Sequence, residues 1–427
     1  MVARKNKSAS TRRLRFPEFI GQPLQELWLG DVTTESGIRN GDELPAASVM
    51  GVSKVDGIVP MEERTIASDI ARYKVVRKDW FAYNPMRLNI GSIARWQGEA
   101  DILVSPDYVV FRCLDNLAFG IEPDYLDHFR RSMSWDSFVS KGGDGSVRVR
   151  IYYKDLASLG LVLPSRAEQK RIADCLRSLD EMIAAQRQKV EALITYKRAL
   201  MQELFPRGGE TVPRFRFPEF RGAPEWEAHA LSHHVSTLDA GVSVNSGDRP
   251  ASGAEIGILK TSCVTSGTFD STENKVVVEP EELHRVKEPV QGDTIIISRM
   301  NTIALVGANA YVERDVPNLF LPDRLWAAKS TRHCNMRFLS YVLGSTQGRA
   351  FLSSLASGSS GTMKNISQSD VLAMPILAPS FAEQLRVAAC FVALDELAAA
   401  ESGKLSALNT RKKGLMQQLF PSMQQAL

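Results

Sequence analysis

One helical motif occurs twice in this chain, and this repeat limits the possible architecture more than any other feature. Residues 163–173 return as residues 378–388, a shift of 215 positions, and both copies contain Pro-Ser-x-x-Glu-Gln. The same shift relates residues 200–206 to residues 415–421, which both read Leu-Met-Gln-x-Leu-Phe-Pro. A gapless repeat of this length indicates two copies of one structural unit in one chain.

Both copies carry the signals of a long helix. Ser165 with Glu168, and Ser380 with Glu383, have the capping-box spacing behind a proline that disfavours helix in the residue before it. Apolar residues then recur at steps of four and three, the pattern of a coiled-coil seam, and each copy ends near Phe-Pro. The predicted seam residues are Ile172, Leu176, Leu179, Ile183, Val190, Leu193, Leu200, Leu204, Val387, Phe391, Leu394, Leu405, Leu408, Leu415 and Leu419.

Polar residues interrupt the seam at the same places in both copies. They are Gln186 and Lys197 in the first copy and Glu401 and Lys412 in the second. Such residues lower stability but fix register and partner. A helix of about 39 residues is about 58 Å long, and its apolar stripe must be covered in water. The simplest cover is the other copy, which would pack antiparallel if a two-fold axis relates the two.

A globular segment precedes each helix. Arg-Phe-Pro-Glu-Phe opens both segments, at Arg15 and at Arg216, a shift of 201 residues that makes the segments differ in length by 14 residues. Their interiors align poorly, but strand-like runs are expected at 73–76, 102–113, 276–278, 294–298 and 305–312, and helices at 124–139 and 335–356.

The predicted fold class is therefore α+β, with two globular domains separated by two long antiparallel coiled-coil helices in a pseudo-two-fold internal repeat. Because the helices are alike and the domains diverge, the domains are expected to read two different targets. The predicted limits are a disordered basic tail at 1–14, a first domain at 15–163, a central helix at 164–206, a second domain at 207–378 and a C-terminal helix at 379–427.

Composition excludes several classes of protein. The shares of hydrophobic (44%) and charged (24%) residues are ordinary for a globular protein. No run of about 18 apolar residues predicts a transmembrane helix. Basic residues without an apolar core precede Phe16, so the N-terminus does not resemble a secretory signal. Five cysteines without C-x-x-C spacing fit a reducing cytoplasm.

No catalytic motif is recognisable. The chain has neither a G-x-x-x-x-G-K-[ST] phosphate loop nor a G-x-G-x-x-G behind a strand. Residues 84–87, Asn-Pro-Met-Arg, lack the second proline and the aromatic residue of the adenine methyltransferase motif, so a turn is the better interpretation. His229, His233 and His234 lack the glutamate of H-E-x-x-H, and ordinary surface histidines are the default. The sequence predicts no catalytic residue and no metal site.

Basic and amide side chains beside loops are the remaining candidates for function. Arg and Lys reach guanine edges and Asn suits adenine, while Gly-rich loops allow close approach to phosphates. For any one residue a solvated charge is an equally good interpretation, and the net charge of +3 indicates no globally basic surface. The candidate DNA-contacting residues are Arg87, Arg95, Lys141, Arg148, Arg150, Lys154, Arg299, Asn301, Lys364 and Asn365.

As a set, these motifs resemble the specificity subunit of type I restriction–modification systems. The resemblance is carried by the two Pro-Ser-x-x-Glu-Gln segments, the two Leu-Met-Gln-x-Leu-Phe-Pro endings and the two Arg-Phe-Pro-Glu-Phe segments. Leu-Asp-Glu at 179–181 and 394–396 and the Gly/Ser-rich residues 358–366 add to it. The resemblance covers essentially the whole chain apart from the basic tail.

The resemblance implies a DNA-binding part of a phage-defence system. The two domains would be target recognition domains, each reading one half of a split, asymmetric double-stranded DNA site. The helices would set the gap between half-sites and dock two methyltransferase subunits, which use S-adenosylmethionine to methylate adenine. Restriction and translocase subunits would join through that core. The specificity subunit itself catalyses nothing and needs no cofactor, and its expected location is the cytoplasm.

Two other hypotheses stay open on the residues alone. A coiled-coil scaffold would bridge protein partners through its helices and bind peptides with its two domains. Salt-dependent, sequence-selective retention of DNA by the assembled complex would discriminate, because a scaffold would show none. A fused methyltransferase or nuclease is disfavoured by the missing cofactor and phosphate motifs.

Overall fold

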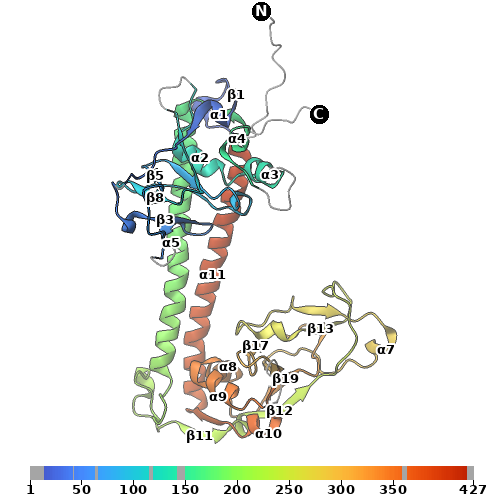
Figure 1. Ribbon diagram of the computed structural model, residues 1–427. Helices are drawn as coiled ribbons and strands as arrows, with labels where there is room; N and C mark the ends of the chain where they lie inside the picture. Colours follow the sequence, from blue (N-terminus) through green and yellow to red (C-terminus); the bar gives the residue numbers. More distant parts are fainter. Residues whose placement is uncertain are drawn as a thin grey trace, which may run out of the picture. The chain divides into compact units, whose positions relative to one another are not determined.

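Two long helices and two β-rich parts make up the chain in the computed structural model, which describes residues 14–41, 43–62, 66–114, 119–141, 150–357 and 363–420. The helices, α5 (Arg166–Leu204) and α11 (Phe381–Leu419), have 39 residues each and pack together (Figure 1). Contacts divide the chain into a first unit, Met1–Gln188 with Ser402–Leu427, and a second unit, Lys189–Glu401. The predicted α+β class with paired long helices is confirmed. The predicted disordered tail lies, except for Leu14, outside the described residues.

The first unit is built around a four-stranded antiparallel sheet in the order β2-β9-β6-β7. All three residues of β6 are buried, and the rings of Phe81 and Phe111 stack at 5.1 Å between centroids. Ile172 and Leu176 of α5 and Leu419 of α11 join the same core, so this unit folds against both helices.

The sheet strands are β2 (Thr33–Glu35), β6 (Phe81–Tyr83), β7 (Ile93–Arg95) and β9 (Val109–Cys113). Further strand pairs are β1 (Gln25–Trp28) with β10 (Gly160–Leu163), β3 (Met50–Ser53) with β4 (Gly57–Pro60), and β5 (Lys74–Val76) with β8 (Ile102–Val104). The helices are α1 (Leu29–Val32), α2 (Pro123–Phe129), α3 (Met133–Lys141) and α4 (Tyr153–Leu156), with 3-10 turns η1 (Pro17–Phe19), η2 (Ala46–Ser48) and η4 (Leu88–Ile90).

The second unit is built around a sheet of the same plan, in the order β12-β19-β15-β17. Its sheet strands are β12 (Val235–Ala240), β15 (Thr294–Ser298), β17 (Asn309–Val312) and β19 (Leu325–Ser330). A three-stranded sheet joins β14 (Asn274–Val276), β13 (Gly257–Leu259) and β18 (Leu319–Phe320), and two pairs join β11 (Glu227–Ala230) with β21 (Pro375–Ala378) and β16 (Met300–Asn301) with β20 (Lys364–Asn365). The helices are α6 (Leu231–His234), α7 (Pro280–Leu283), α8 (Met336–Gly344), α9 (Thr346–Ser354) and α10 (Gln368–Leu372), with 3-10 turns η5 (Pro218–Phe220) and η6 (Thr261–Val264).

The two units share this plan although their sequences align poorly. In both, the four-stranded sheet has the same strand order and every neighbouring pair is antiparallel. The last strand before each long helix, β10 or β21, is displaced by the 215-residue shift of the helices and pairs with the first strand of its own unit. The divergence predicted for the globular parts therefore concerns their side chains and insertions, not the topology of the central sheet.

Some predicted elements are interrupted in the structure. The predicted helix at 335–356 is two helices, because Ser345 ends α8 and its hydroxyl caps α9 by accepting a hydrogen bond from Gly348 N at 3.0 Å. The helix predicted at 124–139 is likewise divided into α2 and α3. The strand predicted at 102–113 is two strands joined by a turn, in which Tyr108 N donates to Ser105 O.

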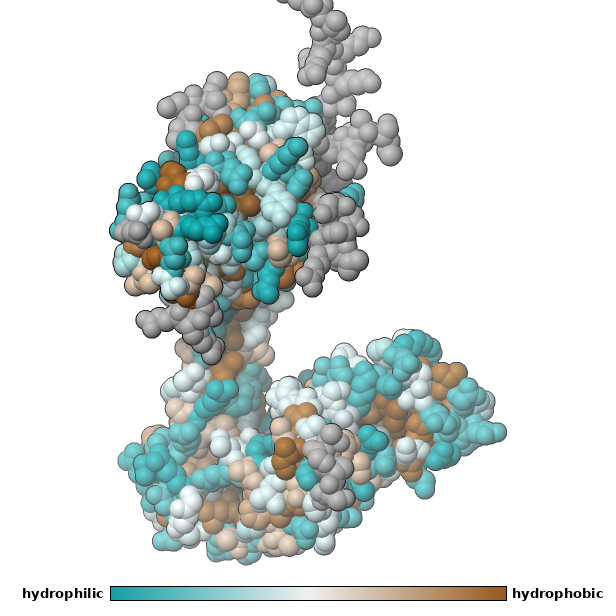
Figure 2. All heavy atoms as spheres, in the orientation of Figure 1, coloured by the Kyte–Doolittle hydropathy of each residue, from teal (hydrophilic) through white to brown (hydrophobic). Residues whose placement is uncertain are grey.

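The visible face of the first unit is mixed in hydropathy. Figure 2 shows that hydrophilic side chains dominate the visible face of the first unit, with hydrophobic atoms scattered among them. No helix within the described ranges is long and apolar enough to cross a membrane.

Candidate nucleic-acid interface

A buried ion pair joins the start of each globular part to the start of a long helix. In the first unit the Arg15 guanidinium binds the Glu168 carboxylate through two hydrogen bonds of 3.1 and 2.6 Å. In the second unit Arg216 binds Glu383 in the same way, at 2.8 and 2.7 Å. Both carboxylates are almost fully buried. Arg-Phe-Pro-Glu-Phe and Pro-Ser-x-x-Glu-Gln, found separately in the sequence, therefore form one bidentate junction.

The glutamine of the same motif binds the helix that faces it. Gln169 Oε1 accepts a hydrogen bond from Glu122 N at the start of α2, at 2.9 Å. Gln384 Oε1 accepts one from Asn335 N at the start of α8, also at 2.9 Å. Each Glu-Gln dipeptide thus fastens two segments of its own unit to the first turn of a long helix.

Three of the four polar interruptions of the seam, Lys197, Glu401 and Lys412, form ion pairs between the helices. Lys197 Nζ lies 2.5 Å from Asp395 Oδ1, and the equivalent pair, Lys412 with Asp180, forms in the first unit. Glu401, which is 4% exposed, binds Lys189 at 3.0 Å. Partner numbers on α11 fall from 401 to 395 as those on α5 rise from 189 to 197, so the helices run antiparallel. The two matched lysine–aspartate pairs fix the register of the seam.

Apolar packing accompanies these ion pairs along the seam. All fifteen predicted seam residues are buried or half-buried. At one end, Phe420 packs edge-on against Tyr125 of α2, with ring centroids 5.1 Å apart. Its counterpart in the repeat, Phe205, stacks on Phe391 at 5.7 Å in the second unit. Phe420 and Phe205 therefore anchor the end of each long helix in an aromatic cluster.

The second unit brings four of the candidate DNA-contacting residues together. Strands β16 and β20 pair antiparallel, with Asn301 opposite Lys364 and Met300 opposite Asn365. Arg299 directly precedes β16, and its guanidinium lies 5.6 Å from the centroid of the Trp326 ring. Residues more than 60 positions apart in sequence thus form one two-stranded cluster of cationic and amide groups. Such groups donate hydrogen bonds to base edges and phosphates.

The first unit holds a looser counterpart of this cluster. Ile151 N donates to Pro85 O at 3.1 Å, which brings the turn containing Arg87 beside Arg150. Arg87, Lys141 and Lys154 are exposed, whereas Arg150 is half-buried. Arg148 lies outside the described residues.

Arg95, another candidate from the sequence, forms ion pairs inside the first unit. Its side chain is only 8% exposed, and it binds Asp79 at 3.1 Å and Asp124 at 2.5 Å. Sequence alone could not distinguish this structural arginine from a surface arginine, because both partners are distant in the chain.

The histidines form a cluster rather than a scattered surface set. The rings of His229 and His233 stack at 4.5 Å, and His333, which the sequence did not indicate, stacks on His233 at 5.4 Å. His234 is 2% exposed, and burial lowers its pKa to about 4. No group of three or more His, Cys, Asp or Glu in the described part of the chain could hold a metal ion.

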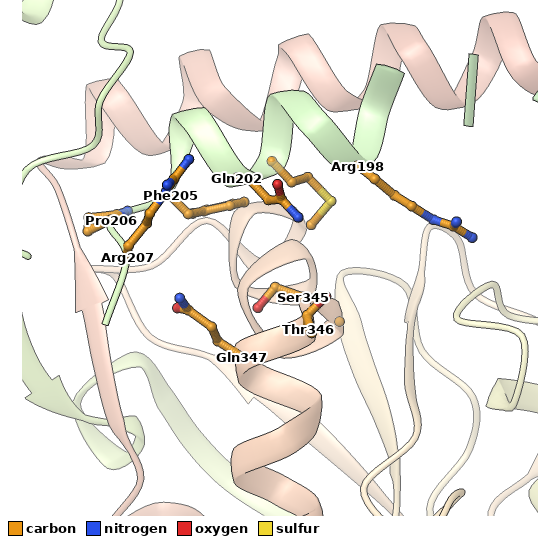
Figure 3. A pocket seen from close by; sticks show the side chains of 10 residues that line it. Arg198, Gln202, Phe205, Pro206, Arg207, Ser345, Thr346 and Gln347 are labelled. Atoms are coloured by element: carbon orange, nitrogen blue, oxygen red, sulfur yellow. The ribbon is translucent and has the colours of Figure 1, made fainter. Parts of the chain in front are cut away.

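A pocket of about 540 Å³ lies in the second unit, between the end of α5 and the α8–α9 junction. Figure 3 shows Arg198, Gln202 and Phe205 on one side and Ser345 and Gln347 on the other. The lining offers positive charge and an apolar wall, but none of the lining residues is a carboxylate, cysteine or histidine. This pocket therefore contains no acid–base pair for catalysis.

Comparisons with known proteins agree with this arrangement. No protein-family model matches the chain. The MjaX type I restriction enzyme specificity subunit of Methanocaldococcus jannaschii is 24% identical over 368 residues, covering 82% of this chain and 80% of that protein. The StySPI specificity subunit of Salmonella potsdam is 21% identical over 309 residues, covering 70% of this chain and 65% of that protein.

Solved structures share the fold along nearly the whole chain. The S subunit of a type I restriction–modification system from M. genitalium matches with a TM-score of 0.57 and 14% identity, covering 95% of this chain and 98% of that one. A chain from a structural study of the complex assembly and conformational transition of a type I system matches with a TM-score of 0.55 and 16% identity, covering 93% and 98%.

Paired antiparallel helices, two sheets of one plan and these relatives define the class, which is that of type I restriction–modification proteins. Within that class the chain belongs to the specificity subunits, which are non-catalytic.

Proposed function

We propose that this chain is the DNA sequence-recognition subunit of a type I restriction–modification complex. Residues 15–163 and 207–378 are its two target recognition domains, and each reads one half of a bipartite, asymmetric site in double-stranded DNA. The main support is that the two units have four-stranded sheets of the same strand order. Exposed or half-buried arginine, lysine or asparagine side chains follow strands of both sheets, but these residues differ between the two units. Equal scaffolds with unlike contact residues suit the reading of two different half-sites.

The helices supply the distance between the half-sites in this proposal. Half-site spacing must match the DNA helical repeat of about 10 base pairs per turn, so a rigid spacer is needed. The matched pairs Lys197–Asp395 and Lys412–Asp180 support this role, because each holds α5 and α11 in one register.

The same helices are the proposed docking site for two methyltransferase subunits, with restriction subunits joining the resulting core. The methyltransferase, and not this chain, would bind S-adenosylmethionine and methylate adenine. A base must leave the stack for such chemistry, and recognition domains bound on both sides of it would hold the opened duplex. The complex would act in the cytoplasm, where the DNA lies.

Mapping of methylated adenines tests the proposal. DNA from cells that express this chain with its own methyltransferase subunit should carry methylation at one split motif, and cells with the methyltransferase alone should lack it. Purified chain alone should transfer no methyl group. A motif that is unchanged when this chain is deleted would contradict the proposal, and a complex that retains DNA without sequence preference would favour a scaffold.

A further inference from the structure

Strands β6 and β15 have the same position in the four-stranded sheets of the two units. Strands β6 and β15 each occupy the third position of the four-stranded sheet, between β9 and β7 in the first unit and between β19 and β17 in the second. All neighbours are antiparallel. The turns that leave β6 and β15 are therefore topologically equivalent.

One backbone hydrogen bond aligns these two turns residue by residue. Ile151 N donates to Pro85 O at 3.1 Å, and Ile366 N donates to Arg299 O at 3.0 Å. The two isoleucines are related by the 215-residue shift and are both buried. Pro85 therefore corresponds to Arg299, which was not visible in the sequence because the globular parts align poorly.

The alignment gives two equivalent pairs of residues after the hydrogen-bonded position. The residues after Pro85 and Arg299 are both methionine, and the next residues are Arg87 and Asn301. Arg87 is exposed and forms no ion pair with any residue that the structure describes. Asn301 is half-buried; its amide donates to Ser298 Oγ at 3.4 Å and accepts from Thr302 N at 2.9 Å. One donor hydrogen and one lone pair of this amide stay available for a bidentate contact.

We infer that Arg87 and Asn301 occupy equivalent positions in the two domains and read different bases. Arginine pairs with O6 and N7 of guanine, and asparagine pairs with N6 and N7 of adenine. The first domain thus reads a G·C pair, and the second domain reads an A·T pair, at the corresponding position of each half-site. This inference rests on the proposed function and adds the base that each domain selects.

Exchanging the two residue types tests this inference. Asn301→Arg, in complex with the methyltransferase, should change one base pair of one half-site from A·T to G·C and leave the other half-site intact. Relative methylation of the two sequences should shift by about 5- to 150-fold, the range for one bidentate contact. Arg87→Asn should cause the converse change in the other half-site. Gln291→Arg, which adds the same charge at an exposed position of the second unit, should leave the motif unchanged.

Asn301→Ala is a second test, for the case in which the larger side chain of Asn301→Arg is not accommodated at this position. With this variant, adenine methylation should occur at sites that carry any of the four base pairs at that one position, while the rest of the motif is kept. Full retention of the A·T preference in Asn301→Ala, or an unchanged motif in Arg87→Asn, would overturn the inference while leaving the proposed function intact. A wild-type complex with no methylation motif at all would overturn both.

Discussion

A buried ion pair joins Arg216, at the start of the second globular part, to Glu383 in the first turn of α11. Arg216 and Glu383 are 8% and 1% exposed, and the buried carboxylate accepts two short hydrogen bonds from the guanidinium. Arg216→Met should destabilise the second unit by about 3–5 kcal/mol because it strands a buried carboxylate. Denaturant unfolding measures this loss. Arg216→Met with Glu383→Leu should cost less than Arg216→Met alone.

An exposed arginine of the same unit is the matched control for this prediction. Arg249 binds Glu255 at 2.6 Å, but their side chains are 56% and 37% exposed. Arg249→Met should therefore leave the free energy of unfolding nearly unchanged, because water solvates both charges of this exposed pair. Equal losses at Arg216 and Arg249 would mean that burial of the junction has no energetic consequence.

Two buried histidines predict how stability depends on pH. Burial lowers the pKa of both His128 and His234 to about 4 in the folded chain. An unfolded histidine has a pKa of about 6.5, so the unfolded state binds more protons below that pH. The contribution of the two neutral histidines to the free energy of unfolding should be fully present above about pH 6.5. It should fall as the pH drops toward 4, by up to about 1.4 kcal/mol per pH unit for each histidine. The double variant His128→Gln, His234→Gln should show a shallower slope in urea unfolding between pH 7 and 5, and an unaltered slope would refute this assignment.

At the scale of elements, the interhelical ion pairs should contribute to pairing as well as to register. Lys197 is 25% exposed and Asp395 also accepts a hydrogen bond from Tyr341 Oη at 2.8 Å, so this pair is partly shielded from water. A double-mutant cycle with alanine at both positions should give a coupling energy of about 1 kcal/mol. The pair Lys275–Asp248, in which the carboxylate is 99% exposed, is the control and should give a clearly smaller coupling energy. Equal coupling in both cycles would argue against a special role for the seam pair.

Elements with local signals could be predicted from the sequence, and those that depend on distant contacts could not. The two helices follow from periodicity and proline stops, and β15 lies at 294–298 as predicted, because these signals lie within a few residues of one another. The common sheet plan escaped prediction, since strand order depends on pairings such as β2 with β9 across more than 70 residues. The cluster of Asn301 with Lys364, and the burial of Arg95, depend on such contacts too.

At the scale of the whole molecule, α5 and α11 act in our account as a spacer between two readers. Lys197 of α5 pairs with Asp395 of α11, and Asp180 of α5 pairs with Lys412 of α11. On α5 the midpoint between the paired residues Asp180 and Lys197 lies between Gln188 and Lys189. On α11 the midpoint between Asp395 and Lys412 lies between Gly403 and Lys404. One heptad inserted at both midpoints would keep the seam pattern and preserve both ion pairs.

The methylation motif produced by this double insertion is the most direct test of the account. One heptad adds about 10 Å of helix, which corresponds to about three base pairs of DNA. Methylation mapping should find both original half-sites separated by a gap about three base pairs longer. A single insertion in α5, which breaks the register, should abolish the motif. Retention of the original gap by the double insertion, or loss of either half-site sequence while methylation persists, would contradict the account.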